Sequence, residues 1–180
     1  MSQIKLKSVD QASAEVKGIL SAVEKKFGFV PNLMKVFASS APTLKAYLTL
    51  ADLMAGTSLT AEEQQLALLA VSQENGCDYC LAAHSMIATN LASVDAQKVR
   101  DLKAKKTIAP DRHQSLVEFT RKVVAKRGFV SDDDVTQFKS AGFDDQQVLE
   151  VLLAVTMKTL SNYANHMAQT PIDAQFANYK

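Results

Sequence analysis

The sequence has almost no net charge and no long hydrophobic run. Its 20 lysine and arginine residues balance 19 aspartate and glutamate residues, which gives a formal charge of +1 at pH 7. Proteins that bind nucleic acids or membrane surfaces need a dominant basic patch, so this balance argues against both kinds of partner. The longest uninterrupted apolar run, Leu66 to Val71, is far shorter than the roughly 20 residues of a membrane span.

Cysteine is also scarce, and this bears on the compartment. Only Cys77 and Cys80 occur, three positions apart. Such a pair cannot form the cross-linked framework of a small secreted protein, and it indicates redox or metal chemistry instead. Residues Met1 to Lys7 lack the apolar stretch of a secretion signal. We therefore expect the protein in the cytoplasm.

Glycine and proline are almost absent from the apolar-periodic segments. All four prolines and five of the six glycines lie between those segments, which is how helical proteins separate their helices. No segment alternates polar and apolar residues for long enough to be a strand, so the sequence predicts an all-α fold. Hydrophobic residues make up 47% of the chain, and we expect residues 1–180 to form one domain.

Apolar residues at three- and four-residue steps predict a series of helices. One helix should begin with the capping-box pattern of Thr60 and Glu63 and end just before Gly76. The next helix should turn Leu91 towards the core, and the last should bury Leu152. The predicted helices cover residues 10–27, 32–39, 43–55, 60–75, 77–91, 94–105, 111–127, 132–140 and 144–168.

The most informative segment places two thiols and an imidazole on one helical face. At about 100° per residue, Cys77, Cys80 and His84 lie within roughly 60° of one another. Cysteines at this spacing are close enough to cycle between dithiol and disulfide with little backbone movement. If Gly76 ends one helix and Cys77 opens the next, the helix dipole lowers the pKa of a thiol there. One turn further on, His84 can take or return the thiol proton.

Two other interpretations of the same residues compete with redox chemistry. Buried cysteines often serve only as core packing, and His84 alone could be a buried histidine with a hydrogen-bond partner. A zinc site would use Cys77, Cys80 and His84, with His113 or His166 as the fourth ligand. Three ligands on two turns of one helix converge poorly on a tetrahedral ion, so we expect no metal and no other cofactor.

The segment Asn75-Gly76-Cys77-Asp78-Tyr79-Cys80, followed by Ala82-Ala83-His84, resembles the alkylhydroperoxidase AhpD and carboxymuconolactone decarboxylase-like family. The specific part of the resemblance lies in residues 60–91. Other segments are similar to the peroxidase-related branch of that family: Val30 to Leu33, Ala41-Pro42, Asn165-His166 and Thr170-Pro171.

The resemblance implies an AhpD-like helical subunit that assembles into homo-oligomers, trimers or hexamers. It implies an oxidoreductase of the peroxidase type, which reduces a hydroperoxide or disulfide substrate with electrons from an external dithiol. By the same resemblance, Cys80 is the thiol that attacks the peroxide, Cys77 closes the disulfide and meets the reductant, and His84 belongs to the proton relay.

The sequence departs from the family pattern at the proton relay. The family often has a glutamate where this chain has Gln65, and Glu74 is then the best-placed substitute. Some relatives carry a relay histidine where this chain has Tyr79, whose phenol is a poor base. His166, at the polar end of the last helix, either lines the pocket or an interface near the cysteines, or offsets the helix dipole.

Two other functions remain open from the sequence. The first is a carboxymuconolactone decarboxylase-like enzyme, which the presence of the Cys-x-x-Cys pair disfavours because that branch does not rely on it. The second is a non-catalytic oligomeric module that senses redox state. The sequence identifies neither the substrate nor the reductant.

Overall fold

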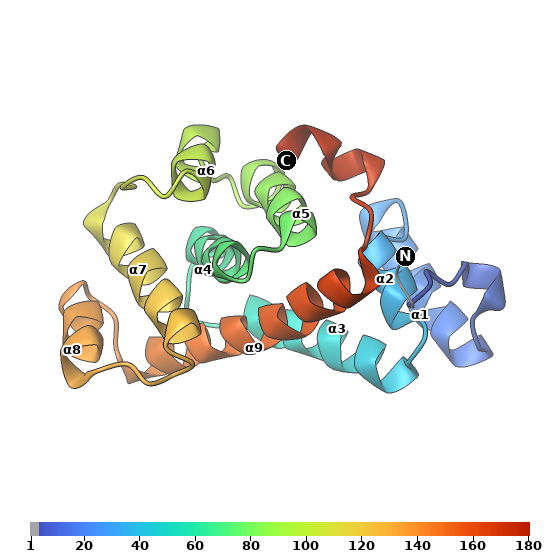
Figure 1. The fold of residues 1–180 in the computed structure, drawn as a ribbon, viewed down its shortest axis with the longest axis horizontal. Coiled ribbons are helices and arrows are strands. Elements are labelled where there is room, and N and C mark those ends of the chain that lie inside the picture. Colours follow the sequence, from blue (N-terminus) through green and yellow to red (C-terminus); the bar gives the residue numbers. More distant parts are fainter. Residues whose placement is uncertain (1–3) are drawn as a thin grey trace.

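The computed structural model describes residues 4–180, which form helices and no strand (Figure 1). This confirms the predicted all-α class. The elements are η1 (Val9–Gln11), α1 (Ala14–Phe27), α2 (Asn32–Phe37), α3 (Ala41–Ala55), α4 (Ala61–Glu74), α5 (Asp78–Asn90), α6 (Ala96–Lys103), α7 (Asp111–Ala125), α8 (Asp132–Ser140), α9 (Asp145–Ala168) and η2 (Ala174–Tyr179).

Local signals in the sequence set several helix ends. At the start of α4, the Thr60 hydroxyl accepts from the Glu63 N–H at 3.2 Å, and the Glu63 carboxylate accepts from the Thr60 N–H at 2.9 Å. This is the predicted capping box, which satisfies two backbone donors that the helix leaves free. Ser131 caps α8 in the same way, and Gly28 ends α1 in the left-handed conformation, with φ 79°.

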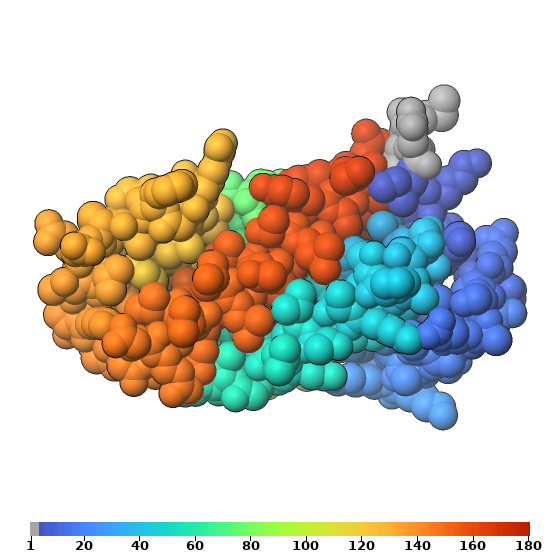
Figure 2. Space-filling view, turned by 90° about the horizontal axis from the view of Figure 1, so that it is seen from below, coloured from blue at the N-terminus to red at the C-terminus, as the bar shows by residue number. Residues whose placement is uncertain are grey.

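Helix α4 lies at the centre of the molecule, and the long helix α9 packs against it (Figure 1). Every residue from Leu66 to Ser72 is buried, so α4 needs neighbours on all sides. It has them in α5, α6, α7 and α9, while α9 also packs against α2 and α3. Figure 2 shows α9 crossing one face of the molecule between α3 and the α7–α8 region. The junction of α4, α5 and α9 holds the two cysteines.

Three details of the fold differ from the prediction. Leu91 is 68% exposed because α5 ends at Asn90 and the chain turns outward there. Leu152 is 49% exposed because it lies on the outer face of α9. The 3-10 helix η2, which packs against α5, was not predicted because six residues are too few to show an apolar period. Among residues 4–180, no helix combines the length and apolarity needed to cross a bilayer.

Candidate active site

A single turn between two helices fixes the position of both cysteines. Gly76 follows α4 with φ 66°, and its N–H donates to the Gln73 carbonyl at 3.0 Å. The Cys77 N–H donates to the Ser72 carbonyl at 2.9 Å. These two bonds form a Schellman motif, which needs a residue with positive φ and therefore favours glycine. Cys77 is at the same time the N-cap of α5, so Cys80 lies in the first turn of that helix.

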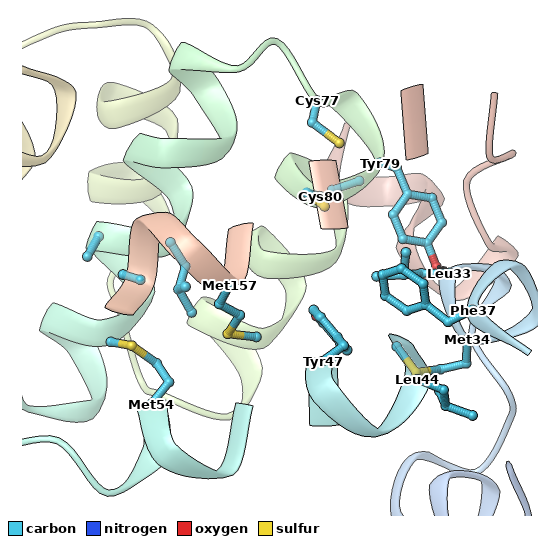
Figure 3. Close-up of a cluster of buried hydrophobic side chains, with 14 of the residues drawn as sticks. Leu33, Met34, Phe37, Leu44, Tyr47, Met54, Cys77, Tyr79, Cys80 and Met157 are labelled. Carbon is cyan, nitrogen blue, oxygen red and sulfur yellow. Dashed lines mark hydrogen bonds between the residues drawn. The ribbon is translucent and has the colours of Figure 1, made fainter. Parts of the chain in front are cut away.

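Both sulfurs are buried and contact polar groups of α9. Cys77 and Cys80 are free thiols, with 1% and 0% of their surfaces exposed. The side-chain N–H of Asn165 donates to the Cys80 sulfur at 3.2 Å and to the Cys77 sulfur at 3.9 Å. The Ser161 hydroxyl oxygen lies 3.9 Å from the Cys80 sulfur. Figure 3 shows the two cysteines at the start of α5, with Tyr47 and Met157 near Cys80.

A buried lysine of α9 supplies the positive charge of the site. Lys158 is fully buried, and its Nζ has no hydrogen-bond partner among residues 4–180. Burial by itself lowers the pKa of Lys158, but the Cys80 thiolate outweighs burial and raises that pKa above its usual value. A buried ammonium without a carboxylate is costly unless another anion accompanies it. Here the nearby Cys80 sulfur is that anion.

The two thiols differ strongly in acidity. Burial alone would raise the pKa of Cys80, but a hydrogen bond from Cys77 and the charge of Lys158 lower it well below its ordinary value. The pKa of Cys77 is raised instead, because its thiol donates to Cys80 and because it is buried. These opposite shifts favour a thiolate at Cys80 beside a thiol at Cys77. Only the thiolate is a strong nucleophile.

Histidine 84 is held as a neutral base. The ring Nδ1 of His84 lies 2.9 Å from the Oε1 of Gln65. An amide oxygen only accepts hydrogen bonds, so Nδ1 carries the proton and Nε2 keeps its lone pair. Burial lowers the pKa of His84 well below its usual value, and the charge of Lys158 lowers it further. The structure thus joins two predicted site residues, Gln65 and His84.

Tyrosine 79 contacts a different set of residues. Its hydroxyl donates to the Asp173 carboxylate at 2.6 Å and accepts from the Leu33 N–H at 3.2 Å. The same carboxylate accepts from the Asn32 N–H at 3.1 Å. Burial raises the pKa of Tyr79, and the hydrogen bond to Asp173 raises it further. These contacts tie α5 to the start of α2 and to the segment before η2.

The remaining predicted residues have partners other than the cysteines. The Glu74 carboxylate pairs with Lys105 at 3.2 Å and lies 3.7 Å from the Arg121 Nε. His166 is exposed on α9, where its ring stacks on that of Tyr163 with centroids 6.3 Å apart. Within residues 4–180, no cluster of three or more histidine, cysteine, aspartate or glutamate side chains is arranged to hold a metal ion.

A cavity of about 490 Å³ opens onto the reactive thiol. Helices α1, α2, α3, α4, α5 and α9 and the 3-10 helix η2 line it, and most of the lining side chains are apolar. Its polar groups include Cys80, His84, Lys158, Gln65 and Tyr47, whereas Cys77 is not among the lining residues. Burial raises the pKa of Tyr47, so this phenol stays neutral. Cys80 is thus part of the wall of this largely apolar cavity, and Cys77 is not.

The sequence reasoning missed three site residues: Lys158, Ser161 and Asn165. All three lie on the buried stripe of α9, which continues Val151 and Ala154 at three- and four-residue steps. The stripe changes from apolar to polar at Lys158 without leaving the buried face. A lysine on the apolar face of a helix is the signal that could have revealed this half of the site.

Comparisons with known sequences support the resemblance. Residues 41–106 match the carboxymuconolactone decarboxylase family. Residues 125–173 match the fungal ubiquitin-associated domain family, although here α9 of that segment packs against α3 and α4. No curated protein matches the chain significantly.

Similar folds occur among solved structures. A peroxidase-related protein from Ralstonia eutropha JMP134, described as an alkylhydroperoxidase AhpD core, has a TM-score of 0.88 and 21% identity over 97% of this chain and 94% of its own. A peroxidase-related protein from Silicibacter sp. TM1040 has a TM-score of 0.82 and 22% identity over 97% and 92%. A variant of the debrominase Bmp8, bound to 2,3,4-tribromopyrrole, has a TM-score of 0.83 and 15% identity over 99% and 96%. The family match over residues 41–106 and these similar folds confirm the resemblance to the AhpD and carboxymuconolactone decarboxylase-like family.

Proposed function

We propose that this chain is a thiol-dependent peroxidase that reduces hydroperoxides through Cys80 and Cys77. One observation carries the proposal: the buried Cys80 sulfur lies at the wall of an apolar cavity, beside the positive charge of Lys158 and the N–H of Asn165. This environment stabilises a thiolate where a small substrate can reach it. A merely structural cysteine needs no such charge.

The proposed reaction has two steps at the protein. The Cys80 thiolate attacks the terminal oxygen of ROOH, the O–O bond breaks, and Cys80 becomes a sulfenic acid while the alkoxide takes up a proton and leaves as ROH. The Cys77 sulfur then attacks the Cys80 sulfur, and the hydroxyl leaves with the Cys77 proton as water. Neutral His84 accepts a hydrogen bond at Nε2 from the entering hydroperoxide.

An external dithiol restores the pair by thiol–disulfide exchange. Because the cavity is lined by Cys80 and not by Cys77, a reductant that enters by the same route attacks the Cys80 sulfur and releases Cys77. This proposal differs from the expectation that Cys77 meets the reductant, and its basis is that the cavity is lined by Cys80 and not by Cys77. The proposal needs no metal or organic cofactor. A supply of dithiols fits the expected cytoplasmic location.

The test is the consumption of cumene hydroperoxide with dithiothreitol as the reductant. We expect turnover by the wild type, and we expect its loss in Cys80→Ser. Without dithiothreitol, Cys77→Ser should consume one hydroperoxide per chain and leave a sulfenic acid on Cys80 that dimedone labels. Hydroperoxide loss that is equal in the wild type and in Cys80→Ser would sink the proposal.

Reductive dehalogenation is a second candidate, favoured by the similar fold of the debrominase and by the apolar cavity. Here the Cys80 thiolate would attack the halogen of an aromatic halide, the carbon would take a proton, and Cys77 would release halide by forming the disulfide. Each chain would thus form one disulfide for each halide ion that it releases. Release of bromide from 2,3,4-tribromopyrrole, without hydroperoxide turnover, would favour this reaction.

We also propose that the chain forms a homo-oligomer, a trimer or a hexamer as the family resemblance implies. The outer face of α9 supports this, because Leu149, Leu152 and Tyr163 are each about half exposed or more. Light scattering after size-exclusion chromatography tests it, and a mass of 19.6 kDa at micromolar concentration would contradict it.

A further inference from the structure

Within the described part of the chain, residues 4–180, no carboxylate pairs with Lys158. Its titratable neighbours are Cys77, Cys80 and His84 on α5 and Tyr47 on α3. Helix α4 presents the amide of Gln65, and not a carboxylate, to the same cavity. His84 and Tyr47 are neutral at physiological pH, since burial moves both of their pKa values towards the neutral form. The Cys80 thiolate is the anion that remains.

The charge of Lys158 therefore depends on the redox state of the cysteines. Interactions between two titrating groups are reciprocal: the ammonium lowers the pKa of Cys80, and the thiolate raises the pKa of Lys158. A disulfide between Cys77 and Cys80 carries no charge. Once it forms, burial acts on Lys158 without opposition and favours the neutral amine.

We propose that Lys158 is the proton carrier of the reaction, giving its proton to the departing alkoxide and remaining neutral for as long as Cys77 and Cys80 are joined. This inference rests on the proposed peroxidase function and assigns the missing proton donor. The family often has a glutamate of the proton relay at the position of Gln65. In this chain Lys158, on α9, takes that role instead.

The proton balance closes within the buried site. Cys80 thiolate, Lys158 ammonium and ROOH give Cys80 sulfenic acid, Lys158 amine and ROH. The Cys77 thiol and the sulfenic acid then give the disulfide and water. Reduction by an external dithiol returns two thiols, and the Lys158 amine takes the Cys80 proton to restore the ion pair. No proton needs to cross from bulk water in any of these steps.

The number of protons taken up on oxidation tests the inference. Reduced protein in weak buffer at about pH 8 is oxidised stoichiometrically with diamide, and a calibrated pH indicator counts the protons per disulfide formed. Diamide needs two protons: Cys77 gives one, and the other comes from Lys158 or from water. We expect the wild type to take up less than half a proton. Uptake of a full proton would overturn the inference.

Two variants serve as references for the proton uptake of the wild type. Lys158→Arg keeps a positive charge but cannot release its proton, so it should show thiolate absorbance and take up one proton per disulfide. Lys158→Met has no charge, so Cys80 should stay a thiol, with no thiolate absorbance and slow oxidation. The wild type must show thiolate absorbance, and its absence also overturns the inference. If Lys158→Arg fails to fold, the number of protons that the wild type takes up per disulfide still tests the inference, because the pH indicator is calibrated.

Oxidation with diamide tests this inference independently of the proposed function. Diamide oxidises accessible dithiols without peroxidase chemistry, so the proton count is obtained whether or not hydroperoxides react. A low count with diamide but no reaction with cumene hydroperoxide would uphold the proton carrier and reject the peroxidase. A full proton with both oxidants would uphold the peroxidase and reject the proton carrier.

Discussion

The His84 ring donates from Nδ1 to the Gln65 amide oxygen at 2.9 Å. A residue of α4 therefore determines that Nε2 is the ring nitrogen left free in the cavity. Replacing Gln65 with glutamate should raise the pKa of His84, because a carboxylate stabilises the imidazolium. Gln65→Met should lower hydroperoxide turnover about tenfold or more, because the ring loses its orienting partner. NMR titration of the imidazole and steady-state rates measure both effects. An unchanged His84 titration in Gln65→Glu, with full turnover in Gln65→Met, would contradict them.

His84 should also make the protein less stable in mild acid. Burial lowers the pKa of His84 in the folded state, so below a pH of about 6.5 the unfolded chain binds more protons than the folded one. Stability then falls as the pH falls, by up to about 1.4 kcal/mol per pH unit. Urea unfolding between pH 5 and 6.5, roughly the window below the free histidine pKa, measures the slope. His84→Gln should flatten it, and an equal slope in both proteins would refute the assignment.

Two glycine substitutions should have effects of opposite sign. Gly76→Ala adds a Cβ that meets nothing within 4 Å but forces alanine to a φ of 66°, which costs about 1 kcal/mol. Gly18 lies inside α1, also with open space around it, so Gly18→Ala should stabilise the fold by about 0.5–1 kcal/mol. Urea unfolding compares the two free energies. Stabilisation by both substitutions would show that the turn before Cys77 does not need glycine.

The Tyr79 hydroxyl should matter for stability. Tyr79→Phe removes the donor to Asp173 and the acceptor for the Leu33 N–H, which should cost about 1–3 kcal/mol of unfolding free energy. Tyr163→Phe is the matched control, because that ring is 55% exposed, and it should change stability by less than about 0.5 kcal/mol. A loss of hydroperoxide turnover in Tyr79→Phe at unchanged stability would assign the phenol to the relay instead.

The sequence predicted the helices well because their ends are coded locally. Capping residues such as Thr60 and Ser131, and glycines such as Gly28, act within a few residues of the helix ends they set. The α5 half of the site was predicted for the same reason, since Cys77 and Cys80 lie within one turn of each other.

The α9 half depends on packing between distant segments. Lys158 and Asn165 come close to the cysteines only because the buried stripe of α9 lies against the start of α5. Helical periodicity places the two residues on one face, but it does not say which helix that face meets. The partner of Tyr79 was missed likewise, since Asp173 lies 94 positions further along the chain.

The turn between α4 and α5 also bears on which changes of chain length the protein tolerates. Only Asn75, Gly76 and Cys77 connect the two helices, and the last serves both of them. One inserted residue would break the hydrogen bonds that Gly76 and Cys77 donate to the end of α4, and the Cys80 sulfur would shift away from the Asn165 amide. The connection between α7 and α8 is longer, and none of its residues is among those that line the cavity, so insertions there should be tolerated. Natural variation in length should therefore collect at such distant loops, while the spacing from α4 to the cysteines stays constant.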